Sequence, residues 1–130
     1  MILTTTLSAA AAAALINVWL MTRCGMLRVS AKVLHGDGGN PALLKRMRAH
    51  ANFIESAPMV LILTAAIELA GKGGIWLPVV VGLYMLLRIS HAFGMELDTG
   101  NPWRAAGAIG TTLTLLGLGV VSVLIALGKF

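Results

Sequence analysis

The chain has 130 residues, of which 58% are hydrophobic and only 12% are charged, and its mean hydropathy is +0.88. No water-soluble domain of this size needs such a composition, so most classes of soluble enzyme are excluded. The single cysteine, Cys24, excludes an intrachain disulfide framework and a cysteine-based zinc cluster, and we expect no metal. The net charge of +5 could suit nucleic acid, but no basic stripe with interleaved aromatic residues is present, so we expect no nucleic-acid partner.

The first apolar segment covers about residues 2–22 and contains an alanine run at positions 9–14. No Lys or Arg precedes Arg23, and the apolar stretch exceeds that of a typical secretion signal, so we interpret it as a retained membrane span. The chain is much more polar between Arg23 and Arg48. Within that segment, residues 35–41 read His-Gly-Asp-Gly-Gly-Asn-Pro, which predicts a loop with several residues suited to positive φ.

Three further apolar segments follow, at about residues 50–70, 75–94 and 103–127. The sequence Gly-Lys-Gly-Gly at 71–74 is typical of a helix end followed by a tight turn, and Pro102 suits the first turn of the last helix. A spanning helix needs roughly 20 mostly apolar residues. We therefore expect one all-α domain over residues 1–130, an integral membrane four-helix bundle embedded in the lipid bilayer.

The positive charges predict how the bundle is oriented. Six of the 10 Lys and Arg residues lie between Arg23 and Arg48, and Arg88 and Arg104 flank the third connection. By the positive-inside rule, the first and third connections face the cytoplasm and both termini lie outside. We thus expect a multi-pass integral membrane protein, in the cell inner membrane if its source is bacterial.

Ionisable groups inside apolar spans are energetically expensive and are hypotheses for function. Arg48, Asn52 and Glu55 form a stripe about 60° wide on the second helix, and Arg88 shares one face of the third with His91. The other cations at this membrane depth belong to the remaining helices: Arg23 and Arg28 end the first span and Arg104 begins the fourth. Several guanidiniums with one carboxylate suit a small anionic ligand that also carries an ammonium group.

Glutathione has this pattern, with two carboxylates, one ammonium and a thiol. Arginine near the sulfur would lower the thiol pKa from about 8.5 toward neutrality and favour the reactive thiolate. Structural interpretations stay open for several residues: Glu55 could pair with Arg48 or with another helix, and His50 could bond across a helix interface. Lys45 and Arg46 could contact lipid phosphates, and Cys24 could be an inert interfacial residue. Glu68 could either extend its carboxylate toward the membrane surface or pair with Lys72.

The chain resembles the MAPEG family, the membrane-associated proteins in eicosanoid and glutathione metabolism, and above all its short bacterial members. The most specific part is residues 48–55, Arg-Ala-His-Ala-Asn-Phe-Ile-Glu, followed by Pro58, which is similar to the signature R-A-x-x-N-x-x-E-x-x-P. Residues 36–39, Gly-Asp-Gly-Gly, and residues 88–94, Arg-Ile-Ser-His-Ala-Phe-Gly, add to the resemblance.

The resemblance implies a homotrimer of four-helix subunits, with glutathione bound between neighbours near the cytoplasmic face. Arg48, Asn52 and Glu55 match the family's glutathione-binding positions, His91 matches a third-helix contact, and Arg104 matches the arginine that stabilises the thiolate. The first-helix contribution stays open between Arg28 and Arg23, and Arg88 completes the binding residues that we expect. Met95 and Ser56 stand where some relatives have tyrosine, which argues against eicosanoid-specific chemistry.

We therefore expect a membrane-bound glutathione S-transferase, with glutathione peroxidase activity as a second reaction, that acts on a lipophilic electrophile or hydroperoxide. One alternative is a non-catalytic member of the fold that binds glutathione or acts as a scaffold. Another is a small multidrug-type transporter, which relies on an acidic residue commonly found in the first span. The first span has no Asp or Glu, and a cationic pocket disfavours a cationic drug.

Overall fold

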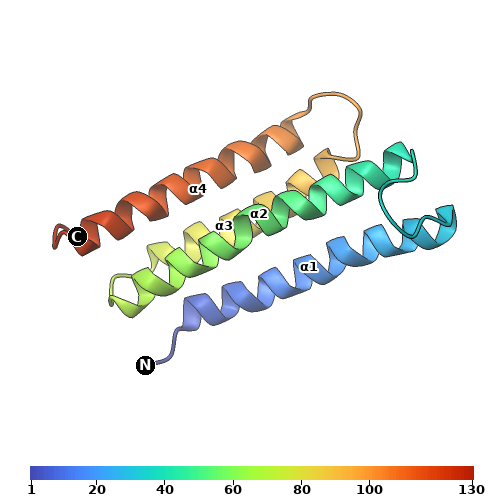
Figure 1. Ribbon diagram of the computed structural model, residues 1–130. Coiled ribbons are helices and arrows are strands. Elements are labelled where there is room, and N and C mark those ends of the chain that lie inside the picture. The colour runs from blue at the N-terminus through green and yellow to red at the C-terminus, as the bar shows by residue number, and fades with distance from the viewer.

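The computed structural model describes residues 1–130 as four helices and no strands. The helices are α1 (Thr4–Ala31), α2 (Pro41–Leu69), α3 (Trp76–Gly94) and α4 (Pro102–Ala126). They run side by side, so that both termini lie at one end of an elongated bundle and the 32–40 and 95–101 connections lie at the other (Figure 1). All four helices are long and apolar enough to cross a membrane.

The starts of α2 and α4 follow from local sequence. Each helix has a proline in its first turn and an asparagine immediately before it. The side-chain oxygen of Asn40 accepts a hydrogen bond from the backbone N–H of Leu43 at 3.1 Å, and that of Asn101 accepts one from Arg104 at 3.0 Å. Such caps satisfy backbone donors that a helix start leaves without partners, so both boundaries are well defined.

The helices extend further into the polar 23–48 segment than the expected spans do. α1 continues to Ala31 and α2 begins at Pro41, so the loop between them is short. The three glycines in this loop adopt positive φ, and the Asp37 carboxylate accepts a hydrogen bond from the Gly39 N–H at 3.0 Å. Rising polarity in the sequence marks the edge of the apolar layer, whereas the helix ends only where its backbone must turn.

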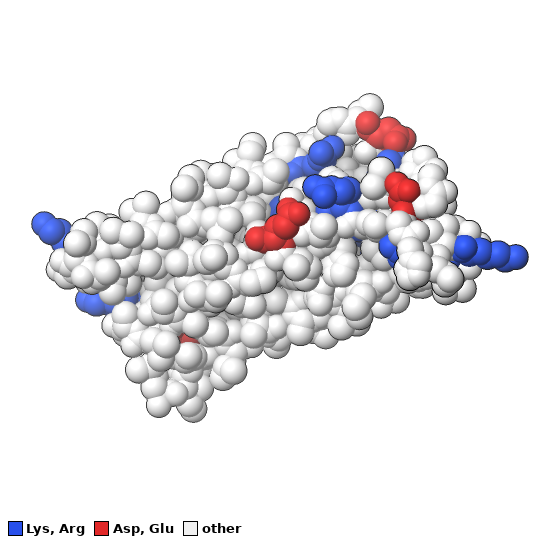
Figure 2. All heavy atoms as spheres, viewed as in Figure 1, with Lys and Arg blue, Asp and Glu red and all other residues white.

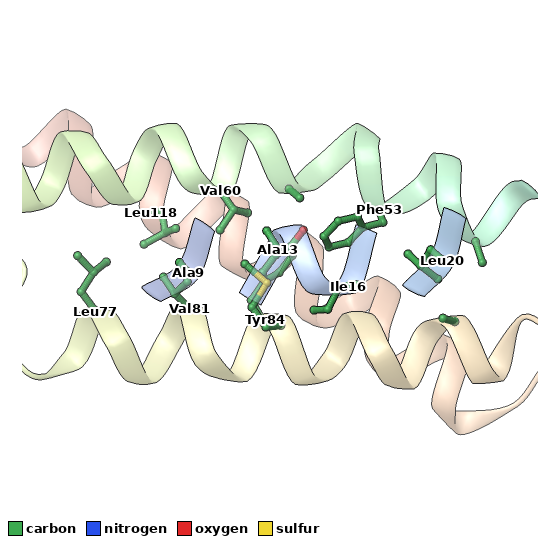
Figure 3. Packing of buried hydrophobic residues seen from close by; sticks show 14 of the residues in the cluster. Ala9, Ala13, Ile16, Leu20, Phe53, Val60, Leu77, Val81, Tyr84 and Leu118 are labelled. Carbon is green, nitrogen blue, oxygen red and sulfur yellow. The ribbon is translucent and has the colours of Figure 1, made fainter. Parts of the chain in front are cut away.

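The core lies along the axis of the bundle, where all four helices contribute side chains (Figure 3). Ala9 and Ala13 of α1 face larger side chains such as Phe53, Val60 and Tyr84, so small residues allow the helices to approach closely. Only two residues of α4, Gly107 and Leu118, are buried. Many large apolar side chains are exposed on the outside of the bundle, which suits contact with lipid or with another membrane helix.

Most charged side chains on the face in view lie in the half of the bundle that carries the 32–40 and 95–101 connections, and an acidic side chain lies near the middle beside a basic patch (Figure 2). Part of this end is held together by Glu96, whose carboxylate pairs with Arg23 of α1 and with Arg46 of α2. Lys45 donates to the backbone oxygen of Glu96 at 3.1 Å and pairs with Asp98 at 2.5 Å. The α3–α4 connection is therefore fastened to α1 and α2.

Candidate functional site

The stripe expected on the second span lies on α2, along the border of its buried face. Asn52 is partly buried, while Arg48 and Glu55 are exposed. Neither charged side chain makes a hydrogen bond or an ion pair within the chain, including with each other. Both charged side chains therefore remain available to a molecule outside this chain.

Arg88 lies directly behind this stripe, in the interior of the bundle, with only 2% of its surface exposed. One guanidinium nitrogen, Nη1, donates to Asn52 Oδ1 on α2 at 2.5 Å, and the other, Nη2, donates to the backbone oxygen of Gly107 on α4 at 2.5 Å. The third nitrogen, Nε, is buried without a partner, and no carboxylate pairs with the group. The Arg88 side chain of α3 thus connects α2 and α4, and both of its hydrogen-bond acceptors are uncharged.

The approach of α4 to this guanidinium depends on the absence of a side chain at Gly107. A Cβ atom there would come within 2.8 Å of the Leu87 backbone oxygen and 3.1 Å of Arg88 Nη2, and it would also overlap the side chain of His91. Glycine therefore allows the α4 backbone to come close enough to accept the hydrogen bond from Arg88.

His91 and Arg104 lie beside this crossing in different environments. His91 is 5% exposed, packs where α3 meets Gly107, and makes no side-chain hydrogen bond within the chain. Arg104 lies one turn before Gly107 at the start of α4, and its side chain is exposed and unpaired. Its backbone is held by Asn101, which also donates from Nδ2 to the Gly94 oxygen of α3 at 2.9 Å.

The two first-helix arginines, between which the sequence left the choice open, both have partners in the chain. Arg28 donates from Nη1 to the Gly36 oxygen at 2.7 Å and contacts the sulfur of Met47 at 3.3 Å. Arg23 pairs with Glu96 and stacks over Trp19, whose ring centroid lies 4.8 Å from the guanidinium carbon. Within one chain, Arg28 thus supports the 32–40 loop and Arg23 supports the α3–α4 connection.

Sequence analysis did not identify the buried pair of Ser56 and Tyr84. Ser56 Oγ and the Tyr84 hydroxyl share a hydrogen bond of 2.6 Å between α2 and α3. Arg88, one turn after Tyr84, lies 6.0 Å from the centroid of its ring. The sequence did contain one indication of a role for Tyr84: it is the only tyrosine of the chain and lies four residues before Arg88, on the same helix face.

Other polar residues serve the packing of the helices. His50 makes a 2.8 Å hydrogen bond to Asn17 of α1 and so lies at a helix interface, while Cys24 is buried and free. Of the two roles expected for Glu68, the ion pair with Lys72 is absent, and the carboxylate accepts hydrogen bonds from the start of α1. Backbone N–H groups at a helix start have no acceptor of their own, so they compete successfully for this carboxylate.

A hollow of about 570 Å³ lies between α1 and α3, and no residue of the stripe lines it. Its lining is mostly apolar and includes Thr4, Thr5 and Ser8. Arg48, Glu55 and Arg104 are exposed, and each lies about one helical turn from Asn52 or Gly107, the two residues that bond to the buried Arg88. The arrangement offers two exposed guanidiniums, one carboxylate and one amide, which together can hold an anion that also carries an ammonium group.

Comparison with known proteins gives a family and a small set of relatives. The model of the MAPEG family matches residues 6–124. The "Inner membrane protein YecN" of Escherichia coli strain K12 is 31% identical over 91 residues, which are 69% of this chain and 68% of the relative, and the protein of the same name from Escherichia coli O6:H1 matches equally. The name of these relatives states no reaction. No solved structure matches the chain at a significant level.

Proposed function

The chain belongs to the MAPEG family, and from this premise we propose that it is a glutathione S-transferase of the inner membrane. The observation that carries the proposal is the set of exposed, unpaired groups beside a buried cation: Arg48, Glu55 and Arg104 next to Arg88. Glutathione supplies two carboxylates for guanidinium groups, one ammonium for a carboxylate, and a thiol. Its charges therefore complement those that the chain leaves without partners.

The residues would divide the work between binding and chemistry. Arg48 binds a carboxylate of glutathione, Glu55 binds its ammonium group, and Asn52 and His91 contact the peptide. Arg104 lies next to the sulfur and stabilises the thiolate. An oriented thiolate then attacks an electrophilic carbon of a lipophilic substrate, forming a carbon–sulfur bond as the leaving group departs with its electron pair.

The same thiolate could reduce a lipid hydroperoxide. In that reaction two molecules of glutathione are oxidised to the disulfide, and the hydroperoxide becomes an alcohol and water. Both reactions need a lipophilic partner, which reaches the site from the bilayer. We further propose that the site faces the cytoplasm and lies between the subunits of a homotrimer, since the exposed charges of α2 require a cover that one chain does not provide.

Glutathione binding to the purified protein in detergent, measured by calorimetry, tests the proposal. We expect saturable binding to the wild type and a loss of affinity of roughly 30-fold in Arg48→Ala, because a charge-assisted contact to a carboxylate is removed. The matched control is Lys32→Gln, which removes a positive charge at the same end of the bundle but outside the stripe. No binding to the wild type, or an equal effect of both variants, would contradict the proposal.

Turnover separates a transferase from a scaffold that binds glutathione. A chlorodinitrobenzene provides an electrophile whose conjugation can be followed by absorbance. We expect turnover in the wild type, and in Arg104→Ala a bound thiol that ionises only as the pH approaches about 8.5, detected by thiolate absorbance in the ultraviolet. Binding without turnover of any electrophile would favour the scaffold.

A further inference from the structure

The side-chain amide of Asn52 has a definite orientation because its two ends differ chemically. Its oxygen can only accept hydrogen bonds and its nitrogen can only donate them, whereas a guanidinium only donates. The contact with Arg88 Nη1 therefore requires Oδ1 of Asn52 to face α3. The amide nitrogen, Nδ2, is then directed away from Arg88, and it has no partner within the chain.

Arg88 is fixed more firmly than Asn52. It is almost fully buried, and its second hydrogen bond goes to the backbone oxygen of Gly107, which cannot rotate away as a side chain could. The Tyr84 ring lies on one side of the guanidinium, and Tyr84 is itself held by Ser56. Asn52 is only partly buried. Asn52 thus adapts to Arg88, and its orientation is determined by α3 and α4.

We infer that Arg88 is a positioning residue that acts through Asn52 and does not itself touch the ligand. By holding Oδ1, it turns the Nδ2 donor toward the stripe between Arg48 and Glu55. The group received at Asn52 must then be a hydrogen-bond acceptor, either a carboxylate or a peptide carbonyl of the thiol peptide. This inference rests on the proposed function, because it assigns a role within the same site.

The electrostatics of Arg88 act in the same direction. Its positive charge has no counter-ion in the chain, and its Nε has no acceptor. A cation in a low-dielectric bundle attracts an anion over a longer distance than one in water, since little solvent screens it. The buried charge therefore favours a carboxylate over a neutral carbonyl at Asn52.

The variant Asn52→Asp tests the orientation with almost no change of shape. One carboxylate oxygen keeps the contact with Arg88 and becomes its counter-ion, so we expect a higher midpoint of thermal unfolding. The other oxygen takes the place of the Nδ2 donor and repels an anion, so glutathione affinity should fall by roughly 30-fold or more. If the amide served packing alone, the midpoint would rise and the affinity would stay the same, which would overturn the inference.

A matched control is Asn17→Asp, which changes an asparagine that also bonds to a side chain on another helix, His50. We expect it to leave glutathione affinity unchanged. A similar loss of affinity in this variant would mean that any new carboxylate in the bundle weakens binding, and the role of Asn52 orientation would then be refuted.

A double-mutant cycle tests whether Arg88 acts through Asn52. Arg88→Met should weaken glutathione binding at least as much as Asn52→Ala, because it removes both the contact that orients Asn52 and the buried positive charge. The loss of affinity in the double variant should be clearly smaller than the product of the two single losses. Losses that multiply fully in the double variant would show that Arg88 acts on the ligand independently of Asn52, and would overturn the inference.

Unfolding measured without any ligand distinguishes a failure of this inference from a failure of the proposed function. In the Arg88→Met background, Asn52→Asp should lower the unfolding midpoint, because the new carboxylate has lost its counter-ion. If the midpoint rises in both backgrounds, Arg88 does not hold Asn52 and the inference is wrong. If the wild type binds no glutathione while this sign reversal is observed, the proposed ligand is wrong and the positioning contact stands.

Discussion

α2 carries two glutamates, one at its middle and one near its end, and the two carboxylates have opposite surroundings. Glu68, near the end of the helix, accepts hydrogen bonds from the backbone N–H groups of Thr5 at 2.9 Å and Thr6 at 2.8 Å, and from the Thr6 hydroxyl at 2.8 Å. Glu55, at the middle of the helix, is exposed and has no partner in the chain. The same type of side chain on the same helix thus has hydrogen-bond partners near the helix end and none at its middle.

The surroundings of Glu68 explain why its charge is tolerated at that place. α1 begins after Leu3, which provides no side-chain cap, so its first N–H groups need an acceptor. Glu68 provides one from another helix and also lies favourably at the positive end of the α1 dipole. Its role is therefore structural. Glu55 has no such contact, which is why we assign its partner to the ligand.

We expect the largest effect from Glu55→Gln, which removes the charge of the glutamate that has no partner in the chain. Glutathione affinity should fall by roughly 100-fold, because the ammonium group of the ligand loses its counter-ion in a site that we propose a neighbouring subunit covers. The thermal unfolding midpoint without ligand should hardly change, since no contact within the chain is lost. Calorimetry and unfolding in the same detergent measure both quantities.

The outcome that would contradict this assignment is a marked loss of stability with unchanged affinity. Glu55 would then have a structural partner, for example in a neighbouring subunit. Size-exclusion chromatography of the variant would identify that case, because loss of a partner between subunits would change the oligomeric state.

Glu68→Ala should have the converse effect. Removing the carboxylate leaves the Thr5 and Thr6 N–H groups without an acceptor, so we expect the unfolding midpoint to fall by roughly 3–5 °C. Glutathione affinity should stay within a factor of about two of the wild type, because Glu68 lies near the opposite end of α2 from the stripe. A loss of affinity as large as that of Glu55→Gln would mean that the two carboxylates do not have separate roles.

Lys72→Ala should have the smallest effect. It tests whether Glu68 serves the start of α1 rather than an ion pair with Lys72. Lys72 is the cation nearest to Glu68 along the chain, but it makes no ion pair with it. We therefore expect the unfolding midpoint to change by no more than about 1 °C, as for a typical exposed substitution. A drop comparable to that of Glu68→Ala would indicate an ion pair with Lys72 and would contradict the capping role.

Much of the fold could be predicted from local sequence. Four apolar stretches separated by polar connections predict four helices, since each stretch must satisfy its backbone hydrogen bonds internally in lipid. The α2 stripe was also accessible, because the angular positions of Arg48, Asn52 and Glu55 depend only on the geometry of one helix. The alignment of these residues on one face is therefore a property of the helix itself.

The hydrogen-bond partners of the polar residues could not be predicted from the geometry of a single helix. Arg88 binds Asn52 and Gly107, which belong to two other helices, and the sequence offered no reason to choose these neutral acceptors over Glu55. The pairing of Glu68 with Lys72 was the simplest expectation from sequence proximity, whereas the start of α1 takes the carboxylate.

Local sequence is enough to set the number of helices, their membrane character and the stripe on α2, because each depends on residues close together in the chain. The tertiary structure is needed to establish which polar groups find partners inside the bundle and which have none in the chain. The reason is that contacts between helices depend on their rotation and distance of approach. Packing at sites such as Gly107 sets these quantities, and local sequence does not.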